Sequence, residues 1–162
     1  MSVGLDKKEF PGINLFDLTG RVAIITGGSK GLGLAMAAGL ASAGAHILLV
    51  NRNKEEGENA AKELATTYPV DAHFFQADVT QQSETEAMAA FAFKQWGRID
   101  ILINSAGINI RGAIDELSLE DFKQVMDVNV TGTWLSSRAV IPYMKKGKRG
   151  SIINLASALG LI

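Results

Sequence analysis

The sequence predicts an α/β protein built on a doubly wound parallel sheet, and two observations support this prediction. First, short apolar runs alternate with segments of helical pattern along the 162 residues. Second, the runs "RVAIIT" (21–26) and "HILLVN" (46–51) are apolar almost throughout, which is typical of parallel strands that helices cover on both faces. We therefore expect a doubly wound sheet with the strand order 3-2-1-4-5.

The first part of the chain divides into three strands and two helices. Residues 21–26 are predicted as the first strand, and a helix follows over about 31–43. The second strand is predicted over 46–51. The run "NKEEGENAAKELATTY" has the period of an amphipathic helix, and Pro69 helps to end it. The third strand is predicted over 72–79, "AHFFQADV".

The remaining part continues the same alternation. A helix is predicted over 83–96, opened by a serine cap and closed before a glycine. The run 99–107, "IDILINSAG", is expected to be a fourth strand that leads into a loop. Residues 118–146 have the pattern of one or two helices, and 150–157, "GSIINLAS", are predicted as the fifth strand.

Length and composition favour one globular domain. The chain has 47% apolar and 20% charged residues, which is neither a disordered nor a membrane-spanning composition. We expect an extended or frayed N-terminal arm over 1–18 and one domain over 19–162. No run is apolar enough for a signal peptide or a membrane span, so a cytoplasmic protein is expected.

Charge and ligand types exclude several classes of function. The net charge of -1 gives no electrostatic reason to expect nucleic acid or an anionic membrane as partner. The chain has no cysteine, and its two histidines, His46 and His73, each stand at the start of a predicted strand. No metal site is therefore expected.

The run "TGGSKGLG" (26–33) predicts a phosphate site between the first strand and the first helix. Glycines allow a tight turn and let backbone N–H groups approach phosphate oxygens, and the helix N-terminus adds a positive dipole. The run is not a P-loop, because Leu34 and Ala35 follow Gly33 instead of lysine and serine or threonine. It also lacks the last glycine of GxGxxG, where Met36 stands. The alternative is a helix start whose glycines serve only close packing.

Several motifs in order resemble the short-chain dehydrogenase/reductase family. The glycine run has the spacing TGxxxGxG, which is that family's dinucleotide signature. "NSAG" (104–107) is similar to the family's NNAG, with Ser105 as the departure. The other matches are the pair Asp78-Val79 at the end of the third strand, Asn129 within "VNV", and Ser157 at the end of "SIINLAS".

The resemblance implies a Rossmann-like dinucleotide-binding domain and a set of site residues. Ser157 would hydrogen-bond the substrate oxygen, and Asn129 would position a water molecule near the family's lysine. Asp78 and Val79 would contact adenine, whereas Asn104 would lie beside the cofactor and Gly107 would let its loop approach. The full set of predicted cofactor-binding residues is Gly27, Ser29, Lys30, Gly31, Leu32, Gly33, Asn51, Arg52, Asp78, Val79, Asn104, Ala106 and Gly107.

The end of the second strand predicts NADP rather than NAD as cofactor. NAD enzymes place an acid there to hold the ribose 2′-hydroxyl, but here Asn51 is followed by Arg52. A guanidinium pairs with a 2′-phosphate, and Lys30 adds a second cation near the same point. The alternative is that both cations are solvated surface charges. A methyltransferase is disfavoured, because its site also calls for an acid where Asn51 stands.

The expected function is hydride transfer between NADP(H) and a secondary alcohol or carbonyl compound. The fragments "FDLTGR" and "NAAKEL" favour a sugar acid or polyol substrate, as in gluconate dehydrogenase-like members. Neither Tyr68 nor Tyr143 has a lysine four residues later, so the family's YxxxK motif is expected beyond Ile162 in a longer protein. The sheet of this chain would then be incomplete on its C-terminal side, and the chain alone inactive. The longer protein would be a homodimer or homotetramer. The alternative is a non-catalytic dinucleotide-binding regulator or scaffold.

Overall fold

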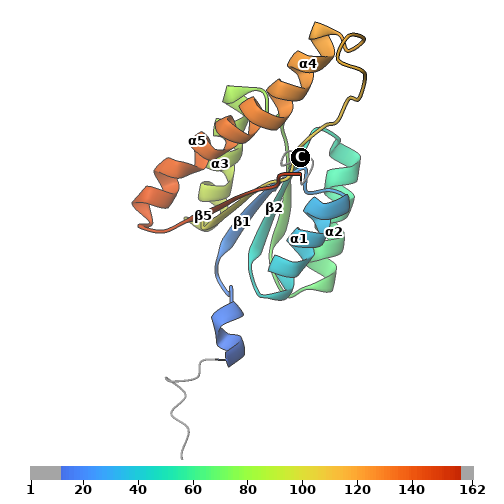
Figure 1. Cartoon of the computed structure of the whole chain (residues 1–162). Helices are drawn as coiled ribbons and strands as arrows, with labels where there is room; N and C mark the ends of the chain where they lie inside the picture. The colour runs from blue at the N-terminus through green and yellow to red at the C-terminus, as the bar shows by residue number, and fades with distance from the viewer. Residues whose placement is uncertain (1–11, 158–162) are drawn as a thin grey trace, which may run out of the picture.

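A five-stranded parallel sheet forms the centre of the computed structural model, which describes residues 12–157. The strands lie in the order β3-β2-β1-β4-β5 (Figure 1), which confirms the predicted fold class and strand order. All four neighbouring pairs are parallel. The strands are β1 (Val22–Thr26), β2 (His46–Asn51), β3 (Ala72–Gln76), β4 (Ile101–Asn104) and β5 (Ser151–Asn154).

Helices cover both faces of this sheet. One face carries α1 and α2, and the other carries α3 and α5, as Figure 1 shows. The helix α4 continues toward α5 above the carboxyl ends of the strands (Figure 1). The helices are α1 (Gly31–Ser42), α2 (Lys54–Thr67), α3 (Gln82–Trp96), α4 (Leu119–Met126) and α5 (Gly132–Lys146).

Alternation along the strands divides the core into two layers. Ile24 and Leu48 face the layer of α3 and α5, whereas Ile25 and Leu49 face the layer of α1 and α2. Successive side chains of a strand point to opposite faces, so each central strand must be apolar at every position. This explains why the central strands read as continuous apolar runs in the sequence.

β3 and β5 are shorter than the sequence predicted, whereas β4 leads into a loop as expected. β3 ends at Gln76, and Asp78 then accepts hydrogen bonds from the backbone N–H and hydroxyl of Thr80. β4 ends at Asn104, after which the N–H groups of Ser105 and Ala106 turn toward the Thr26 hydroxyl. β5 likewise covers only part of 150–157.

The expected helical segment 118–146 is two α-helices joined by one π-helical turn. Ser118 caps α4 by accepting the N–H of Asp121 at 3.0 Å. The turn η2 (Asp127–Thr131) then leads directly into α5. A π-turn inside a helix often marks a functional position, and this one contains Asn129.

The expected N-terminal arm, 1–18, falls only partly within the described residues. Its described part begins with a 3-10 helix, η1 (Gly12–Phe16), instead of an extended segment. Leu18 already belongs to the folded body, because its N–H donates to Ala43 O at 2.7 Å and its side chain packs on the core. Within residues 12–157, no helix has the length and apolar character needed to cross a bilayer.

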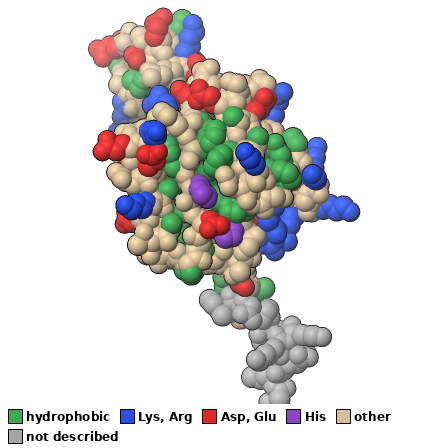
Figure 2. Space-filling model, turned by 180° about the vertical axis from the view of Figure 1, so that it is seen from behind, with side chains coloured by type: hydrophobic (Ala, Val, Ile, Leu, Met, Phe, Trp, Pro, Cys, Tyr) green, Lys and Arg blue, Asp and Glu red, His purple; other side chains and the backbone are tan. Residues whose placement is uncertain are grey.

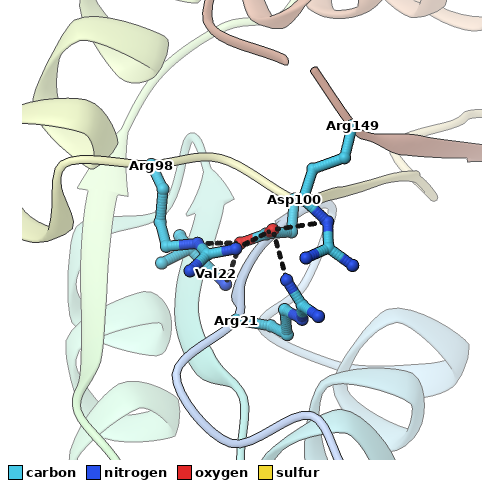
Figure 3. Close-up of polar contacts among 5 residues, drawn as sticks. All are labelled: Arg21, Val22, Arg98, Asp100 and Arg149. Atoms are coloured by element: carbon cyan, nitrogen blue, oxygen red, sulfur yellow. Dashed lines mark hydrogen bonds and ion pairs between the residues drawn. The ribbon is translucent and has the colours of Figure 1, made fainter. Parts of the chain in front are cut away.

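A carboxylate ties the amino ends of three neighbouring strands together. Asp100 is only 6% exposed and accepts the N–H of Val22 at 3.0 Å. Arg98 donates two hydrogen bonds to it, at 2.7 and 2.6 Å. Arg21 and Arg149 approach the same carboxylate at 3.5 and 3.8 Å, as Figure 3 shows. Arg21 precedes β1, Arg98 and Asp100 precede β4, and Arg149 precedes β5.

Trp96 lies between the two histidines at the end of α3. Its ring stacks on His46, with centroids 6.0 Å apart and planes 8° apart, and is tilted against His73 at 5.3 Å. Its indole N–H donates to the Asp71 carboxylate at 3.4 Å. The histidines lie on the face seen in Figure 2. This contact joins α3 to β2 and β3.

Candidate functional site

A cleft lies at the carboxyl ends of β1, β2, β3 and β4. In a doubly wound sheet, ligands bind at this edge, where the strand order reverses. All the predicted cofactor-binding residues except Gly31, Leu32, Gly33 and Asn104 line this cleft. The lining consists of Gly27, Ser29, Lys30, Val50, Asn51, Arg52, Asn53, Glu56, Ala77, Asp78, Val79, Ala106, Gly107, Ile108 and Val128.

The glycine loop leaves bare backbone at Gly27, which lines the cleft, and at Gly33, which lies outside the lining at the start of α1. Gly27 has φ +64°, and a Cβ there would lie 2.8 Å from the Ala106 backbone. A Cβ at Gly33 would lie 2.3 Å from the carbonyl oxygen of Gly27. α1 begins directly after Lys30, which makes no side-chain capping hydrogen bond. The first N–H groups of α1 therefore have no side-chain cap, which suits an anion.

Thr26 connects the end of β1 to the loop that follows β4, and sequence reasoning missed it. Its hydroxyl accepts the N–H groups of Ser105 and Ala106 at 3.3 and 3.2 Å, and the side chain is buried. This places Ala106 against Gly27. The available signal was a polar residue at the end of an otherwise apolar strand, next to the glycine run.

Glu56 is a second residue that sequence reasoning missed, and it lies at the centre of the polar end of the cleft. Its carboxylate accepts hydrogen bonds from the Ser29 hydroxyl and, at 3.3 Å, from Lys30. The amide of Asn51 donates to Ser29 and, at 3.5 Å, to Glu56. The Ser29 hydroxyl and the Lys30 ammonium hold the pKa of Glu56 below its ordinary value.

Arg52 lies on the other side of this polar end. Its guanidinium is 3.9 Å from the Asp78 carboxylate and its side chain is 67% exposed. The carboxylate of Asp78 already accepts a hydrogen bond from the backbone N–H of Thr80. The backbone N–H of Asp78 donates to the Glu84 carboxylate at 2.7 Å. The structure thus brings Arg52 and Asp78 together, as two predicted site residues from neighbouring strands.

Asn104 is buried beneath the cleft instead of lining it. Its amide N–H group donates to Asn154 at 2.8 Å and to Ser137 at 3.1 Å. It therefore links β4 to β5 and to α5. Asn104 is the last residue of β4 and directly precedes the loop 105–107 that lines the cleft. It therefore anchors the start of this loop to β5 and α5.

Asn129 holds the loop that follows β4. Its amide oxygen accepts the N–H of Ile108 at 2.8 Å, and its amide nitrogen donates to the carbonyl of Ile108 at 2.9 Å. A Cβ at Gly107 would lie 3.3 Å from the Asn129 oxygen. The π-turn thus places Asn129 against the loop that lines the cleft.

Ser157 is exposed and follows the carboxyl end of β5. Asn154, the last residue of β5, pairs with Asn104 in the sheet register. Ser157 therefore lies at the same edge of the sheet as the cleft, although outside its lining. The predicted loop residues Gly31, Leu32 and Gly33 also lie outside the lining, at the start of α1.

Known proteins match the whole domain just described. The family model for the short chain dehydrogenase matches residues 21–162. A 3-alpha-(or 20-beta)-hydroxysteroid dehydrogenase of Mycobacterium bovis is 37% identical over 144 residues, which cover 89% of this chain and 54% of the relative. An uncharacterised oxidoreductase of Methylorubrum extorquens is also 37% identical, over 88% of this chain and 56% of the relative.

A solved structure agrees with this relationship. The crystal structure of a short-chain type dehydrogenase/reductase from Mycobacterium marinum has a TM-score of 0.88 and 36% sequence identity. The match covers 93% of this chain and 61% of the solved one. The chain thus spans between half and two thirds of the length of these relatives. The glycine loop, the sheet order and these matches together show that the chain belongs to the short-chain dehydrogenase family.

Proposed function

We propose that the protein transfers a hydride between NADP(H) and a secondary alcohol or carbonyl compound in the cytoplasm, and that residues 19–162 form its dinucleotide-binding domain. One observation supports this most strongly. The glycine loop and the two cations, Lys30 and Arg52, line one cleft at the carboxyl edge of the sheet. We infer that both cations would pair with the 2′-phosphate of NADP.

Gly27 lines the cleft with bare backbone, and a Cβ there would lie 2.8 Å from the Ala106 backbone, which supports a dinucleotide as the ligand. The bound nicotinamide supplies or accepts the hydride. We assign the phosphates to the glycine loop and to the start of α1. The proposed contacts are Gly27, Ser29, Gly31, Leu32 and Gly33 for the phosphates, Lys30, Asn51, Arg52, Asp78 and Val79 for the adenosine part, and Asn104, Ala106 and Gly107 for the wall near the nicotinamide.

Two further residues receive roles in the reaction. We assign to Ser157 a hydrogen bond to the substrate oxygen, in keeping with its place at the carboxyl edge of the sheet. Asn129, which the resemblance links to a water molecule, also acts as a positioning residue, because its amide fixes Ile108 and the adjoining Gly107. Exchange of Asn129 is then expected to affect both cofactor affinity and turnover.

The substrate class proposed from the sequence is a sugar acid or polyol. One relative is named as a hydroxysteroid dehydrogenase, so a panel of substrates must contain both classes. Oxidation or reduction of a sugar acid with NADP(H), followed by absorbance at 340 nm, supports the proposed class. Turnover of the steroids alone contradicts it.

Cofactor binding tests the central part of the proposal. Titration calorimetry with the purified protein is expected to give a lower Kd for NADPH than for NADH. Equal or tighter binding of NADH contradicts the NADP assignment. Binding without turnover of any substrate favours the alternative, a non-catalytic dinucleotide-binding regulator or scaffold.

We also propose that the protein assembles as a homodimer or homotetramer through α4 and α5. An apolar stripe runs along these helices on the protein surface, and Arg138 covers the Trp134 ring at 5.4 Å. An exposed apolar area of this kind favours a protein partner. The stripe consists of Leu119, Phe122, Met126, Val130, Trp134 and Ile141.

A further inference from the structure

Glu56 makes contacts that its position in α2 does not explain. Asn53 caps α2 by accepting the N–H of Glu56 at 3.1 Å. In a reciprocal capping box, the acid three residues after the cap returns a hydrogen bond to the N–H of that cap. The Glu56 carboxylate instead crosses to Ser29 and Lys30 on the glycine loop. The carboxylate is therefore placed in the cleft, where it remains 31% exposed.

This placement changes the charge of the polar end of the cleft. Lys30 pairs with Glu56 at 3.3 Å, and Arg52 lies 3.9 Å from Asp78. Each cation proposed for the 2′-phosphate thus already faces one carboxylate. A 2′-phosphate must compete with Glu56 for Lys30 and must lie close to the Glu56 charge, which is unfavourable for two anions.

A ribose 2′-hydroxyl, unlike a 2′-phosphate, interacts favourably with the Glu56 carboxylate. A hydroxyl donates a hydrogen bond, and an ionised carboxylate is a strong acceptor. The acid that usually holds this hydroxyl stands at the end of the second strand, where this chain has Asn51. Because Asn51 and Glu56 approach each other at 3.5 Å, Glu56 brings a carboxylate to the same part of the cleft from the next helix.

We propose that Glu56 is a specificity-determining residue that lowers the preference for NADP over NAD, by competing with the 2′-phosphate for Lys30 and accepting the 2′-hydroxyl of NAD. This inference rests on the proposed dinucleotide binding. It predicts that NADP is preferred less strongly than the two cations alone suggest.

The substitution Glu56→Gln tests this inference, since glutamine keeps an acceptor for the Ser29 hydroxyl and removes the charge. Titration calorimetry measures the Kd of NADP⁺ and NAD⁺ for the purified wild type and variant. We expect the Kd of NADP⁺ to fall about fivefold, as for removal of one partly screened like charge. The Kd of NAD⁺ is expected not to fall.

The ratio of the two Kd values separates selectivity from a purely structural effect. NADP⁺ and NAD⁺ differ only at the 2′ position, so a loosened cleft weakens both and leaves the ratio unchanged. The matched control is Glu58→Gln, which removes the same charge from the same helix, where Glu58 pairs with Lys54 at 3.7 Å and with no other residue of the described range 12–157. The control is expected to keep the wild-type ratio.

Three results overturn the inference. An unchanged or lowered preference for NADP⁺ in Glu56→Gln overturns the inference about Glu56 but leaves the proposed function intact. An equal change in the ratio of the two Kd values in the Glu58→Gln control has the same consequence. If the wild type binds neither dinucleotide, the proposed function fails and the inference falls with it. Should Glu56→Gln not fold, as judged by circular dichroism, Glu56→Asp replaces it. That variant retracts the carboxylate by one methylene, and the same rise in NADP⁺ preference is expected, with a smaller size.

Discussion

Gly27 shows at the scale of one residue why the cleft needs bare backbone. The substitution Gly27→Ala puts a methyl group 2.8 Å from the Ala106 backbone at a φ of +64°. We expect a loss of about 1–3 kcal/mol of unfolding free energy and loss of NADPH binding. Thermal melts and calorimetric titration check both effects.

The control for Gly27 is Gly39→Ala in the middle of α1. Apart from its chain neighbours and the backbone of its own helix, no described atom lies within 4 Å of a Cβ at Gly39, and its φ is not in the left-handed region. Alanine there is expected to stabilise the helix by up to about 1 kcal/mol and leave cofactor affinity unchanged. Tight NADPH binding by Gly27→Ala would contradict the assigned role of the loop.

Individual site residues were predictable where one motif fixes both the residue type and its place. Lys30 and Asp78 line the cleft, because Lys30 directly precedes α1 and Asp78 lies two residues after β3. Glu56 was not predictable, because the spacing from Asn53 reads as a helix cap and hides the longer contact to Ser29. Asn104 was placed beside the cofactor from its motif, but the buried pairing with Asn154 depends on the sheet register.

At the scale of elements, the apolar stripe on α4 and α5 gives a prediction about assembly. Trp134 lies in this stripe and is 59% exposed. The substitution Trp134→Glu places a charge in the proposed interface, where a buried unpaired charge is costly. We expect a shift from the oligomer to the monomer in sedimentation velocity experiments.

The control for the assembly prediction is Ala65→Glu, an exposed position on α2 at the opposite layer. It is expected to keep the assembly of the wild type. A wild-type protein that sediments as a monomer at all concentrations would refute the proposed interface.

The elements themselves followed from sequence patterns, whereas their ends and one turn did not. The position of β2 was predictable because its apolar run is continuous. The start of α2 has an equally local signal, since the Asn53 side chain caps the helix. β3 ends at Gln76 because Asp78 bonds to Thr80, and an apolar pattern does not record that competition. The π-turn Asp127–Thr131 is followed by Gly132, which packs so closely on Val79 that a Cβ would approach to 2.6 Å, and a helical pattern does not record this long-range contact.

At the scale of the whole molecule, Asp100 connects segments that are distant in the sequence. The substitution Asp100→Asn leaves Arg98, Arg21 and Arg149 without their shared anion. We expect a loss of about 1–3 kcal/mol of unfolding free energy at pH 7, since the charge-assisted hydrogen bonds of Asp100 are lost while the three arginines remain partly hydrated. Urea denaturation of the variant and of Asp115→Asn, an exposed control, checks this size.

The same carboxylate predicts how stability depends on pH. Burial alone would raise the pKa of Asp100, but hydrogen bonds from Arg98 and Val22 and the charges of Arg98 and Arg21 hold it below its ordinary value. The stabilisation is thus complete above the unfolded-state pKa of about 3.9 and is lost as the pH falls through the folded-state value. The difference between wild type and Asp100→Asn should shrink below about pH 4. A constant difference from pH 7 to pH 2 would contradict this account.

The contacts of Trp96 with His46 and His73 make the indole an intrinsic optical probe of folding. The sequence contains one other tryptophan, Trp134, which is exposed on the proposed assembly surface. The fluorescence of the two indoles therefore reports on different surroundings and on different processes. The fluorescence of Trp96 changes when α3 separates from the sheet, whereas the fluorescence of Trp134 changes when two copies of the protein associate. Emission spectra of two variants, each with one tryptophan replaced by phenylalanine, distinguish unfolding from dissociation without any attached dye.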